Sequence, residues 1–444
     1  MLKYLAIFSI FFQIFSINSA QAVCMSNCKP KHPLVRAAKI LYPGKIWPSL
    51  ASRKIHFDLS PVLADRLCRN TIWEKAYSYD ITKLKIMSSL KNPNDLRKSP
   101  YAEELINSLI SATSNFLATE NDDAAKFAIK LMLEFATADY PKLQQKKRWS
   151  HTISSGALFL FAAASAFQFL EDYEHFSVAD HSKIAQWLES KILNSEIRRK
   201  RNRKWHSKND AIRGNAIKKR RDGIVVTCCN SSRFESTRLQ VDNALFAGAV
   251  LFNNKSALKD ALNGYFEVLN TLRKDGSLPY QTARGNAAIW YQNLGVNVMV
   301  VMAEMAANQN INLYNARSAA GMTIHDAINY LAKSIANPAI IYPYARLNLN
   351  PWHRASGKKV DPLDYRKQFG PAKMARYQQS RSQASHFLAW TVPYYKRFSE
   401  TPKAITLRKQ LMKIGFDPSS PPSIAPLYND YTGANMSCLF SPLD

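Results

Sequence analysis

The amino-acid sequence predicts an all-α fold. Hydrophobic residues recur with helical periodicity over segments of roughly 15–20 residues along most of the chain. Strand patterns are scarce, and the best of them, Ile224–Val226, is very short. Strands do not alternate with helices as they do in parallel-sheet proteins. A ring of paired helices would give this pattern.

The expected helices follow one another from about residue 98 onward. In the first, Ala102–Leu117, apolar residues recur at helical spacing. Asn121–Asp123 then predicts the start of a second helix, which carries apolar residues from Phe127 to Phe135. Gly156–Leu170 is the most apolar later stretch, and we expect it to be a buried helix. The remaining expected helices are 150–172, 179–196, 237–254, 255–273, 286–308, 324–337 and 379–398.

The composition is that of a globular protein with a strong positive charge. The chain has 444 residues, of which 46% are hydrophobic and 21% charged, so wholesale disorder is excluded. Its 60 Lys and Arg residues against 33 Asp and Glu give a formal charge of +27. The length allows two or three domains, but one large toroid or barrel also fits. We expect a single domain over residues 23–444, with residues 23–60 as an N-terminal wrapping segment.

Residues 1–22 have the three parts of a secretory signal. Lys3 is followed by the apolar stretch Tyr4–Ile17, and small residues, Ala20 and Ala22, precede the expected cut. The apolar stretch is shorter than the roughly 20 residues that a spanning helix needs. We therefore expect cleavage near Ala22, a periplasmic or secreted protein, and no stable membrane insertion. An oxidising compartment permits disulfides, and the pairing stays open among Cys24, Cys28, Cys68, Cys228, Cys229 and Cys438.

Residues 198–221 carry the strongest local charge, with twelve Lys and Arg residues and one acidic residue. One interpretation is a solvated basic loop. The other is an electropositive rim that captures a polyanion. In an exported protein the available polyanion is an acidic polysaccharide or an envelope surface, so we expect no nucleic-acid partner.

The candidate chemistry lies just after the turn signal Asp275–Pro279. Arg284 and Tyr291 are seven residues apart, which on a helix is about two turns, so both can lie on one face. A free tyrosine has a pKa of about 10, and a nearby guanidinium lowers that pKa. Such a tyrosine can take a carbon-bound proton and later protonate a leaving oxygen. The alternative, which spacing alone favours, is a core aromatic with a satisfied hydroxyl.

The run DGSLPYQTARGNAAIWYQNLGVNVMVVMAEMA resembles the central motif of the alginate lyase superfamily. It is most similar to the mannuronate lyases of polysaccharide lyase family 5. The helix pair over Thr237–Asn270 and the C-terminal Tyr431–Phe440 are also similar, and the resemblance covers about residues 235–310. The resemblance implies an (α/α) toroid of helical hairpins with a deep cleft. It also implies β-elimination on a polyuronate, with alginate or polymannuronate as the favoured substrate. This reaction requires neither a cofactor nor a metal.

The resemblance further implies that Tyr291 is the acid/base and that Arg284 is its electrostatic partner. The chain departs from the family at one point. The family opens the earlier helix with Asn-Asn-His, whereas the corresponding zone here, Glu235–Asn243, has no histidine. The candidates for the group that neutralises the substrate carboxylate are therefore Asn243, Gln240 and Arg238 on that helix, or Asn230 beside the cysteine pair.

Asn243 is the residue that we expect to neutralise the carboxylate, because an amide can donate a hydrogen bond to it. The alternative for Asn243 is a hydrogen bond within helix packing. Gln240 lies three residues earlier on the same helix face, and we expect it to bind substrate together with Arg238. A further candidate cluster lies in an expected loop and consists of Trp352, His353 and Arg354. These side chains can stack on and pair with a uronate ring, or they can only anchor the loop.

Three functions stay open. An exported polyuronate lyase is favoured. A non-catalytic anionic-polysaccharide-binding relative is supported by the missing Asn-Asn-His and by the positive charge. An exported binder of nucleic acid or of the envelope surface rests on residues 198–221 alone. We expect the protein to be a monomer whose partner is an anionic polysaccharide.

Overall fold

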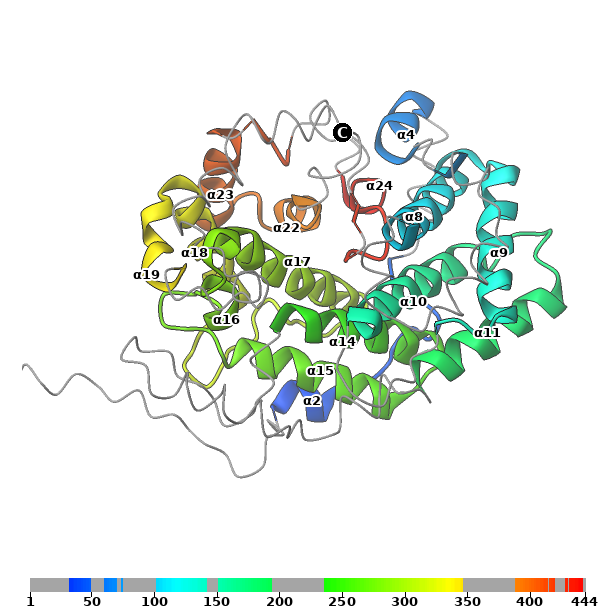
Figure 1. Ribbon diagram of the computed structural model, residues 1–444, viewed down its shortest axis with the longest axis horizontal. Coiled ribbons are helices and arrows are strands. Elements are labelled where there is room, and N and C mark those ends of the chain that lie inside the picture. The colour runs from blue at the N-terminus through cyan, green and yellow to red at the C-terminus, as the bar shows by residue number, and fades with distance from the viewer. Residues whose placement is uncertain are drawn as a thin grey trace, which may run out of the picture.

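The computed structural model describes ten stretches of the chain. These are residues 32–48, 60–69, 73–74, 101–141, 151–193, 235–345, 388–413, 415–419, 428–429 and 431–441, with side chains throughout except at 101–104, 151–155 and 235–238. Every regular element within them is a helix (Figure 1). The α-helices are α2 (Pro33–Ala37), α4 (Pro61–Cys68), α8 (Tyr101–Thr119), α9 (Asp122–Thr137), α10 (His151–Phe169), α11 (Val178–Ile192), α14 (Glu235–Leu251), α15 (Lys255–Leu269), α16 (Pro279–Thr282), α17 (Ala288–Ala307), α18 (Ile324–Ala336), α19 (Tyr342–Ala345), α22 (Thr391–Phe398), α23 (Pro402–Lys413) and α24 (Met436–Phe440). The 3₁₀-helices are η2 (Gly285–Ala287) and η3 (Pro338–Ile340).

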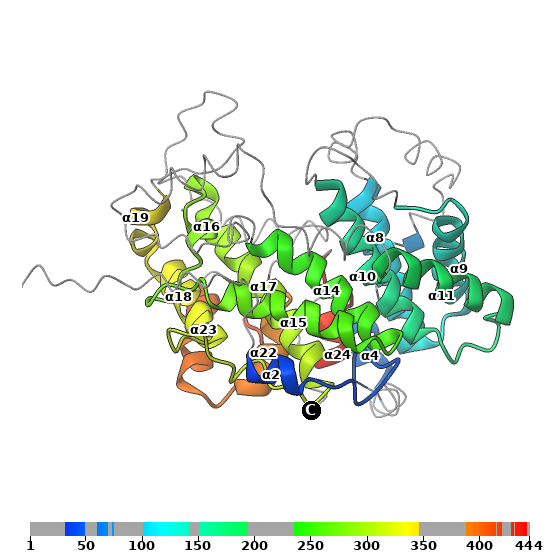
Figure 2. The same cartoon turned by 90° about the horizontal axis from the view of Figure 1, so that it is seen from below.

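The longer helices form hairpins arranged as an (α/α) toroid. Helix α8 packs on α9, α10 on α11, α14 on α15, α17 on α18 and α22 on α23. The first helices of successive hairpins also contact one another, α8 against α10, α10 against α14 and α14 against α17. In Figures 1 and 2, α10, α14 and α17 lie side by side, with α9 and α11 beyond α10 and α18 beyond α17. The predicted fold class is confirmed.

The inner and outer helices differ in how their apolar residues are distributed. In α17 every residue from Gln292 to Ala306 is buried. In the outer helix α11 only Ile184, Trp187, Leu188 and Ile192 are buried, at the spacing of one helix face. A helix that is buried on all sides must be surrounded by other helices, whereas a one-faced helix lies at the surface. The expected buried helix over 156–170 is confirmed, because α10 is such an inner helix.

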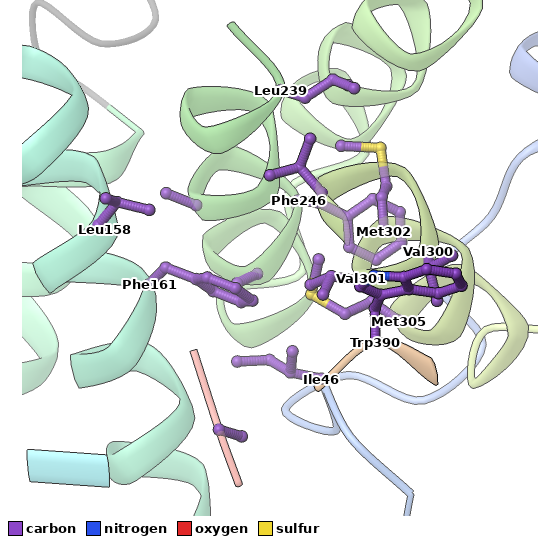
Figure 3. Packing of buried hydrophobic residues seen from close by; sticks show 14 of the residues in the cluster. Ile46, Leu158, Phe161, Leu239, Phe246, Val300, Val301, Met302, Met305 and Trp390 are labelled. Carbon is purple, nitrogen blue, oxygen red and sulfur yellow. The ribbon is translucent and has the colours of Figure 1, made fainter. Parts of the chain in front are cut away.

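The hydrophobic core lies between the inner helices. Figure 3 shows Phe161 of α10, Phe246 of α14, Met305 of α17 and Trp390 pointing into the same space. All four are fully buried and belong to one cluster that extends from Val35 to Phe440. Burial of each such side chain contributes roughly 1.5–3 kcal/mol to folding. The core therefore holds the inner helices, including the one that carries the site, in fixed positions.

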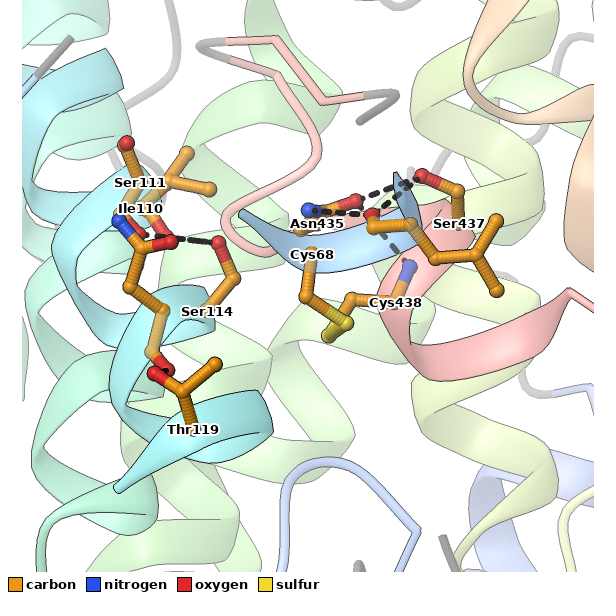
Figure 4. The surroundings of a disulfide bond; sticks show 10 residues. Cys68, Ile110, Ser111, Ser114, Thr119, Asn435, Ser437 and Cys438 are labelled. Carbon is orange, nitrogen blue, oxygen red and sulfur yellow. Dashed lines mark hydrogen bonds between the residues drawn. A yellow bond between two sulfur atoms is a disulfide. The ribbon is translucent and has the colours of Figure 1, made fainter. Parts of the chain in front are cut away.

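The ring is closed where the N-terminal helix α4 meets the C-terminal helix α24. Helix α22 contacts α24, α24 contacts α4, and α4 contacts α8. Cys68 and Cys438 form a disulfide across this closure, 370 residues apart in sequence and 4.8 Å apart at their Cα atoms (Figure 4). Asn435 donates a hydrogen bond to the Leu67 carbonyl, 3.1 Å away, beside it. The other cysteines lie outside the described residues: Cys24, Cys28, Cys228 and Cys229.

The N-terminal stretch 32–48 packs against elements that are distant in sequence. The Trp47 indole donates a hydrogen bond to the Ser165 hydroxyl of α10 at 2.8 Å. Gln309, just after α17, accepts hydrogen bonds from the backbone N–H groups of Leu41 and Tyr42, both at 3.0 Å. Helix α2 lies on α15. This part of the expected wrapping segment thus contacts three hairpins.

Some expectations differ from the structure, and others concern residues outside the described part of the chain. Of the helix expected over 379–398, residues 379–387 lie outside the described residues. In the described remainder, α22 begins at Thr391, and Pro393, which lacks a backbone N–H, lies in its first turn. Sequence periodicity missed α23 and the short helices. Residues 1–22, 198–221 and 224–226 lie outside the described residues. Within the described part of the chain, no helix is both long enough and apolar enough to cross a membrane.

Candidate active site

The expected turn at Asp275–Pro279 is present and is built around Gly276. Its φ angle is +88°, and a Cβ at this position would lie 2.1 Å from the carbonyl oxygen of Asp326. Only glycine satisfies both conditions. The Asp275 carboxylate accepts a hydrogen bond from the Ser277 N–H at 2.9 Å, which fixes the turn. The turn therefore packs closely against the start of α18, just before α16 begins.

Helix α16 is held at both ends. At its start, the Leu278 N–H donates to the Gln292 side-chain oxygen on α17 at 3.0 Å. A Cβ on Gly295 of α17 would come within 2.3 Å of the Leu278 side chain, so the two helices approach closely. At its end, the Arg273 guanidinium donates to the Thr282 hydroxyl at 2.9 Å. These contacts place the side chains of α16 and of the following residues against the first turn of α17.

Arg284 and Tyr291 meet here, as their spacing predicts. Arg284 lies just before η2, outside the helix, and Tyr291 lies in the first turn of α17. The guanidinium carbon of Arg284 is 4.1 Å from the centroid of the Tyr291 ring. It is also 4.2 Å from the centroid of the Tyr280 ring on α16. The cation therefore contacts two aromatic faces rather than one phenol hydroxyl.

Arg284 is a buried cation without a counter-ion among the residues that the structure describes. Its side chain is 5% exposed, and its Nε is buried with no hydrogen-bond partner. No ion pair or hydrogen bond joins its guanidinium to any other residue that the structure describes. Burial of an unpaired charge is unfavourable, and each aromatic face offsets about 0.5–2 kcal/mol of that cost. The in-plane N–H groups of a guanidinium match a planar carboxylate.

Tyr291 is partly buried at the edge of the core. The Trp290 ring meets it edge-on, with the ring centroids 4.5 Å apart. Its hydroxyl forms no hydrogen bond with any described residue. The alternative of a core aromatic with a satisfied hydroxyl therefore does not describe Tyr291 within this part of the chain.

The candidate residues of helix α14 differ in the hydrogen bonds that their side chains form. Asn243 is fully buried, and its side-chain amide donates to the Val298 carbonyl of α17 at 3.2 Å. This is the contact that the helix-packing alternative expects, and a role of Asn243 at the substrate carboxylate stays a prediction. Gln240 is 5% exposed, and its amide has no hydrogen-bond partner among the described residues. Arg238 lies in α14 with its side chain outside the described set.

The other expected binding residues, Trp352, His353 and Arg354, lie outside the described residues. Within the described ranges, no three His, Cys, Asp or Glu side chains gather where they could hold a metal ion.

Tyr280 is the site residue that sequence reasoning missed. It precedes Arg284 by four residues, a spacing at which side chains on a helix are neighbours. That spacing was the available signal. Helix α16 is only four residues long, however, so the contact depends on how the turn at Gly276 docks α16 onto α17.

Comparison with known proteins gives matches by sequence and by structure. Residues 241–341, which include Arg284 and Tyr291, match the family model of alginate lyase. Comparison with curated protein sequences gives no match. Among solved structures, alginate lyase A1-III from Sphingomonas species A1 matches with a TM-score of 0.62 and 17% identity, over 93% of this chain and 99% of that one.

Two variants of alginate lyase A1-III, each in complex with a tetrasaccharide, are also similar. The tyrosine-to-phenylalanine variant has a TM-score of 0.62 and 16% identity, over 93% of this chain and 99% of its own. The histidine-to-alanine variant has a TM-score of 0.53 and 18% identity, over 77% and 76%. At these identities the structures establish the shared fold. Together with the family match, they support a polysaccharide lyase of the alginate lyase superfamily, most like family 5.

Proposed function

We propose that this polysaccharide lyase is an exported enzyme that cleaves an anionic polyuronate by β-elimination, with alginate or polymannuronate as the favoured substrate. The observation that carries the proposal is the contact between Arg284 and Tyr291. Among the described residues, the buried Arg284 cation has no counter-ion and the Tyr291 hydroxyl has no hydrogen-bond partner. The tetrasaccharide complexes of alginate lyase A1-III support a polysaccharide as the partner.

Export is supported by two separate features. Residues 1–22 have the pattern of a secretory signal. The Cys68–Cys438 disulfide is the kind of bond that persists in oxidising compartments. We therefore propose a periplasmic or secreted location.

Arg284 binds the carboxylate at C6 of the uronate. Two N–H groups in one plane donate to the two carboxylate oxygens, and the positive charge compensates the negative one in a buried setting. Withdrawal of electron density from the carboxylate acidifies the proton at C5. The substrate carboxylate thus supplies the anion that Arg284 lacks in the unbound protein.

Tyr291 moves the proton. Its phenolate takes the C5 proton, the C5–H electron pair forms the C4–C5 double bond, and the C4–O4 bond breaks. The tyrosine hydroxyl then returns the proton to the departing O4, which balances the reaction. One side chain can therefore serve as base and then as acid.

Gln240 is the residue of α14 that we propose as a second donor to the substrate. The Gln240 amide forms no hydrogen bond with a described residue, whereas the Asn243 amide donates one to the Val298 carbonyl. An amide N–H can donate to a carboxylate oxygen. Arg238 and the cluster of Trp352, His353 and Arg354 stay proposals for substrate binding.

A non-catalytic polysaccharide-binding protein is the second candidate. The observation that favours it is the absence of the Asn-Asn-His motif in Glu235–Asn243, combined with the use of the Asn243 amide in helix packing. Such a protein would keep Arg284 as a carboxylate-binding group and would lack full assistance at the carboxylate.

The experiment that separates the two candidates measures cleavage directly. Residues 23–444 are incubated with polymannuronate, polyguluronate and polyglucuronate, and the ultraviolet absorbance of the unsaturated product is followed. We expect one polymer to be cleaved. We expect Tyr291→Phe to reduce turnover by at least about a thousandfold with little loss of binding, because the ring stays on Arg284 while the proton carrier is lost.

Tyr395→Phe is the matched control, since Tyr395 is a partly buried tyrosine on α22 that also lies near an arginine, Arg408. This control should cleave at the wild-type rate. Turnover retained in Tyr291→Phe would refute the acid/base role. Binding without cleavage by the wild-type protein would establish the second candidate instead.

A further inference from the structure

We infer that Tyr280 is a positioning residue. The face of its ring contacts the Arg284 guanidinium and so leaves the guanidinium N–H groups for a substrate carboxylate. This inference rests on the proposed function of Arg284 as the carboxylate-binding group. It assigns to α16 a role in substrate recognition and not only in packing.

The first argument is the chemistry of the contact. The Tyr280 and Tyr291 ring centroids lie 4.2 and 4.1 Å from the guanidinium carbon of Arg284. An aromatic face attracts a cation through its quadrupole and uses none of the cation's hydrogen bonds. The five N–H donors of a guanidinium lie in its own plane. A ring can therefore stabilise the buried charge without competing for those donors, whereas a carboxylate neighbour would occupy them.

The second argument is that Tyr280 is held rigidly. It is 7% exposed, and it lies within α16, which is anchored at Leu278 by Gln292 and at Thr282 by Arg273. Arg273 is in turn covered by the Tyr344 ring, 3.9 Å from its guanidinium carbon.

The Tyr344 hydroxyl donates to the Asp275 carboxylate at 2.8 Å. This outer cluster joins the turn, α16 and α19. A ring fixed in this way restricts Arg284 to one orientation, which a bidentate contact requires.

The consequence concerns which ligands the site accepts. A guanidinium that contacts two aromatic faces can still offer its N–H groups to a planar anion. The site should therefore select sugars that carry a carboxylate over neutral sugars of the same size. Tyr280 contributes to this selection through Arg284 and without contact to the reacting atoms.

The experiment compares three substitutions of Tyr280 in residues 23–444. Tyr280→Phe keeps the ring, Tyr280→Leu keeps apolar volume without the ring, and Tyr280→Glu places a carboxylate beside Arg284. KM and kcat are measured on the cleaved polymer. Binding of mannuronate, guluronate and glucuronate tetrasaccharides is measured by calorimetry in the Tyr291→Phe background, so that no ligand is consumed.

We expect Tyr280→Phe to match the wild-type protein within about twofold, because the aromatic face is retained. Tyr280→Leu should raise KM and the tetrasaccharide Kd roughly tenfold, with a smaller change in kcat. Tyr280→Glu should raise Kd further, roughly a hundredfold, because its carboxylate competes with that of the ligand. Tyr395→Leu removes a tyrosine of α22 that lies near Arg408 of α23, and it should change neither KM nor Kd.

The outcomes separate this inference from the proposed function. Cleavage by the wild-type protein with unchanged KM and Kd in Tyr280→Leu would overturn the role of Tyr280 and leave the lyase standing. Binding without cleavage, weakened by Tyr280→Leu, would support Tyr280 and overturn the lyase. If the wild-type protein cleaves no polymer and no tetrasaccharide binds, both fail. If Tyr280→Leu does not fold, equal Kd values for Tyr280→Phe and Tyr280→Glu would overturn the inference.

Discussion

Arginine and tyrosine side chains meet near both ends of α17, but only the C-terminal end supplies a carboxylate. There, Glu304 accepts two hydrogen bonds from Arg397, at 3.1 and 2.7 Å, and one from the Tyr314 hydroxyl at 2.6 Å. At the N-terminal end, Arg284 contacts the Tyr280 and Tyr291 rings and no described carboxylate. The first cluster is complete within the protein, whereas the second lacks an anion.

The tyrosines of the two clusters are therefore suited to different tasks. Burial, together with the adjacent Glu304 carboxylate, raises the pKa of Tyr314 well above its ordinary value. The Tyr314 hydroxyl stays protonated and acts as a fixed donor. Tyr291 has no such carboxylate beside it and no hydrogen-bond partner in the described part of the chain. The comparison teaches that an arginine beside a tyrosine marks a functional site only where the counter-ion is missing.

Removal of the Arg284 charge should give the largest effect and test the comparison directly. We expect Arg284→Met to lower kcat/KM at least about a hundredfold, because the donor to the developing charge is lost. The free energy of unfolding should stay unchanged or increase, because an apolar side chain replaces an uncompensated buried charge. Initial rates and urea denaturation measure the two quantities.

Arg284→Lys is the companion variant. It keeps the charge but loses the planar, bidentate geometry, so it should recover only part of the activity. A loss of about 3 kcal/mol in stability on Arg284→Met would break the comparison, since it would make Arg284 a structural residue like Arg397.

Substitution at the complete cluster should show the opposite pattern. Arg397→Met leaves Glu304, whose side chain is 1% exposed, as a buried charge without its cation. We expect the free energy of unfolding to fall by about 3 kcal/mol, with KM unchanged in the folded protein. Urea denaturation and steady-state kinetics check both parts.

A second substitution serves as the control for Arg397. When Glu304→Met is added to Arg397→Met, part of the lost stability should return, because the unpaired carboxylate is removed as well. A raised KM in Arg397→Met would show that the two ends of α17 are coupled and would weaken the distinction between them.

Another paired arginine, Arg408, sharpens the comparison with a smaller and pH-dependent effect. Burial alone would raise the pKa of Asp417, but hydrogen bonds from Arg408 and Ser419 outweigh it and lower that pKa to about 2. The folded-state pKa lies below the value in the unfolded chain. The pair therefore contributes stability above about pH 4, and this stability is lost as the pH falls toward 2.

We expect Asp417→Asn to lower the free energy of unfolding by about 2 kcal/mol at pH 7. The difference from the wild-type protein should shrink between about pH 4 and pH 2, as measured by urea denaturation at several pH values. A difference that stays constant over this range would exclude the ion pair as its cause.

Much of the fold was accessible from the sequence because it depends on local patterns. Hydrophobic periodicity located the long helices, and the apolar stretch from Gly156 correctly indicated a buried helix. Helix boundaries were less accessible. The start of α22 depends on Pro393 and on Trp390, whose indole donates to Asn293 of α17 at 2.8 Å. That is a contact between residues far apart in the chain.

The candidate site likewise has features that local sequence predicts and features that depend on contacts between distant residues. The spacing of Arg284 and Tyr291 and the family resemblance were enough to single out this pair. The role of Tyr280 was not accessible, because it follows from the docking of α16 onto α17 through Gly276 and Gln292. The environment of Asn243 was equally hidden, since a helix position alone does not say which neighbouring carbonyl its amide will meet.

The disulfide between Cys68 and Cys438 makes most of the chain a covalent circle. A protease that cuts this circle once, at any exposed bond between the two cysteines, produces two peptides that stay joined. Release of a fragment requires either a second cut or reduction of the bond. Loops that connect the hairpins can therefore be nicked without separation of the α16–α17 region from the rest of the molecule.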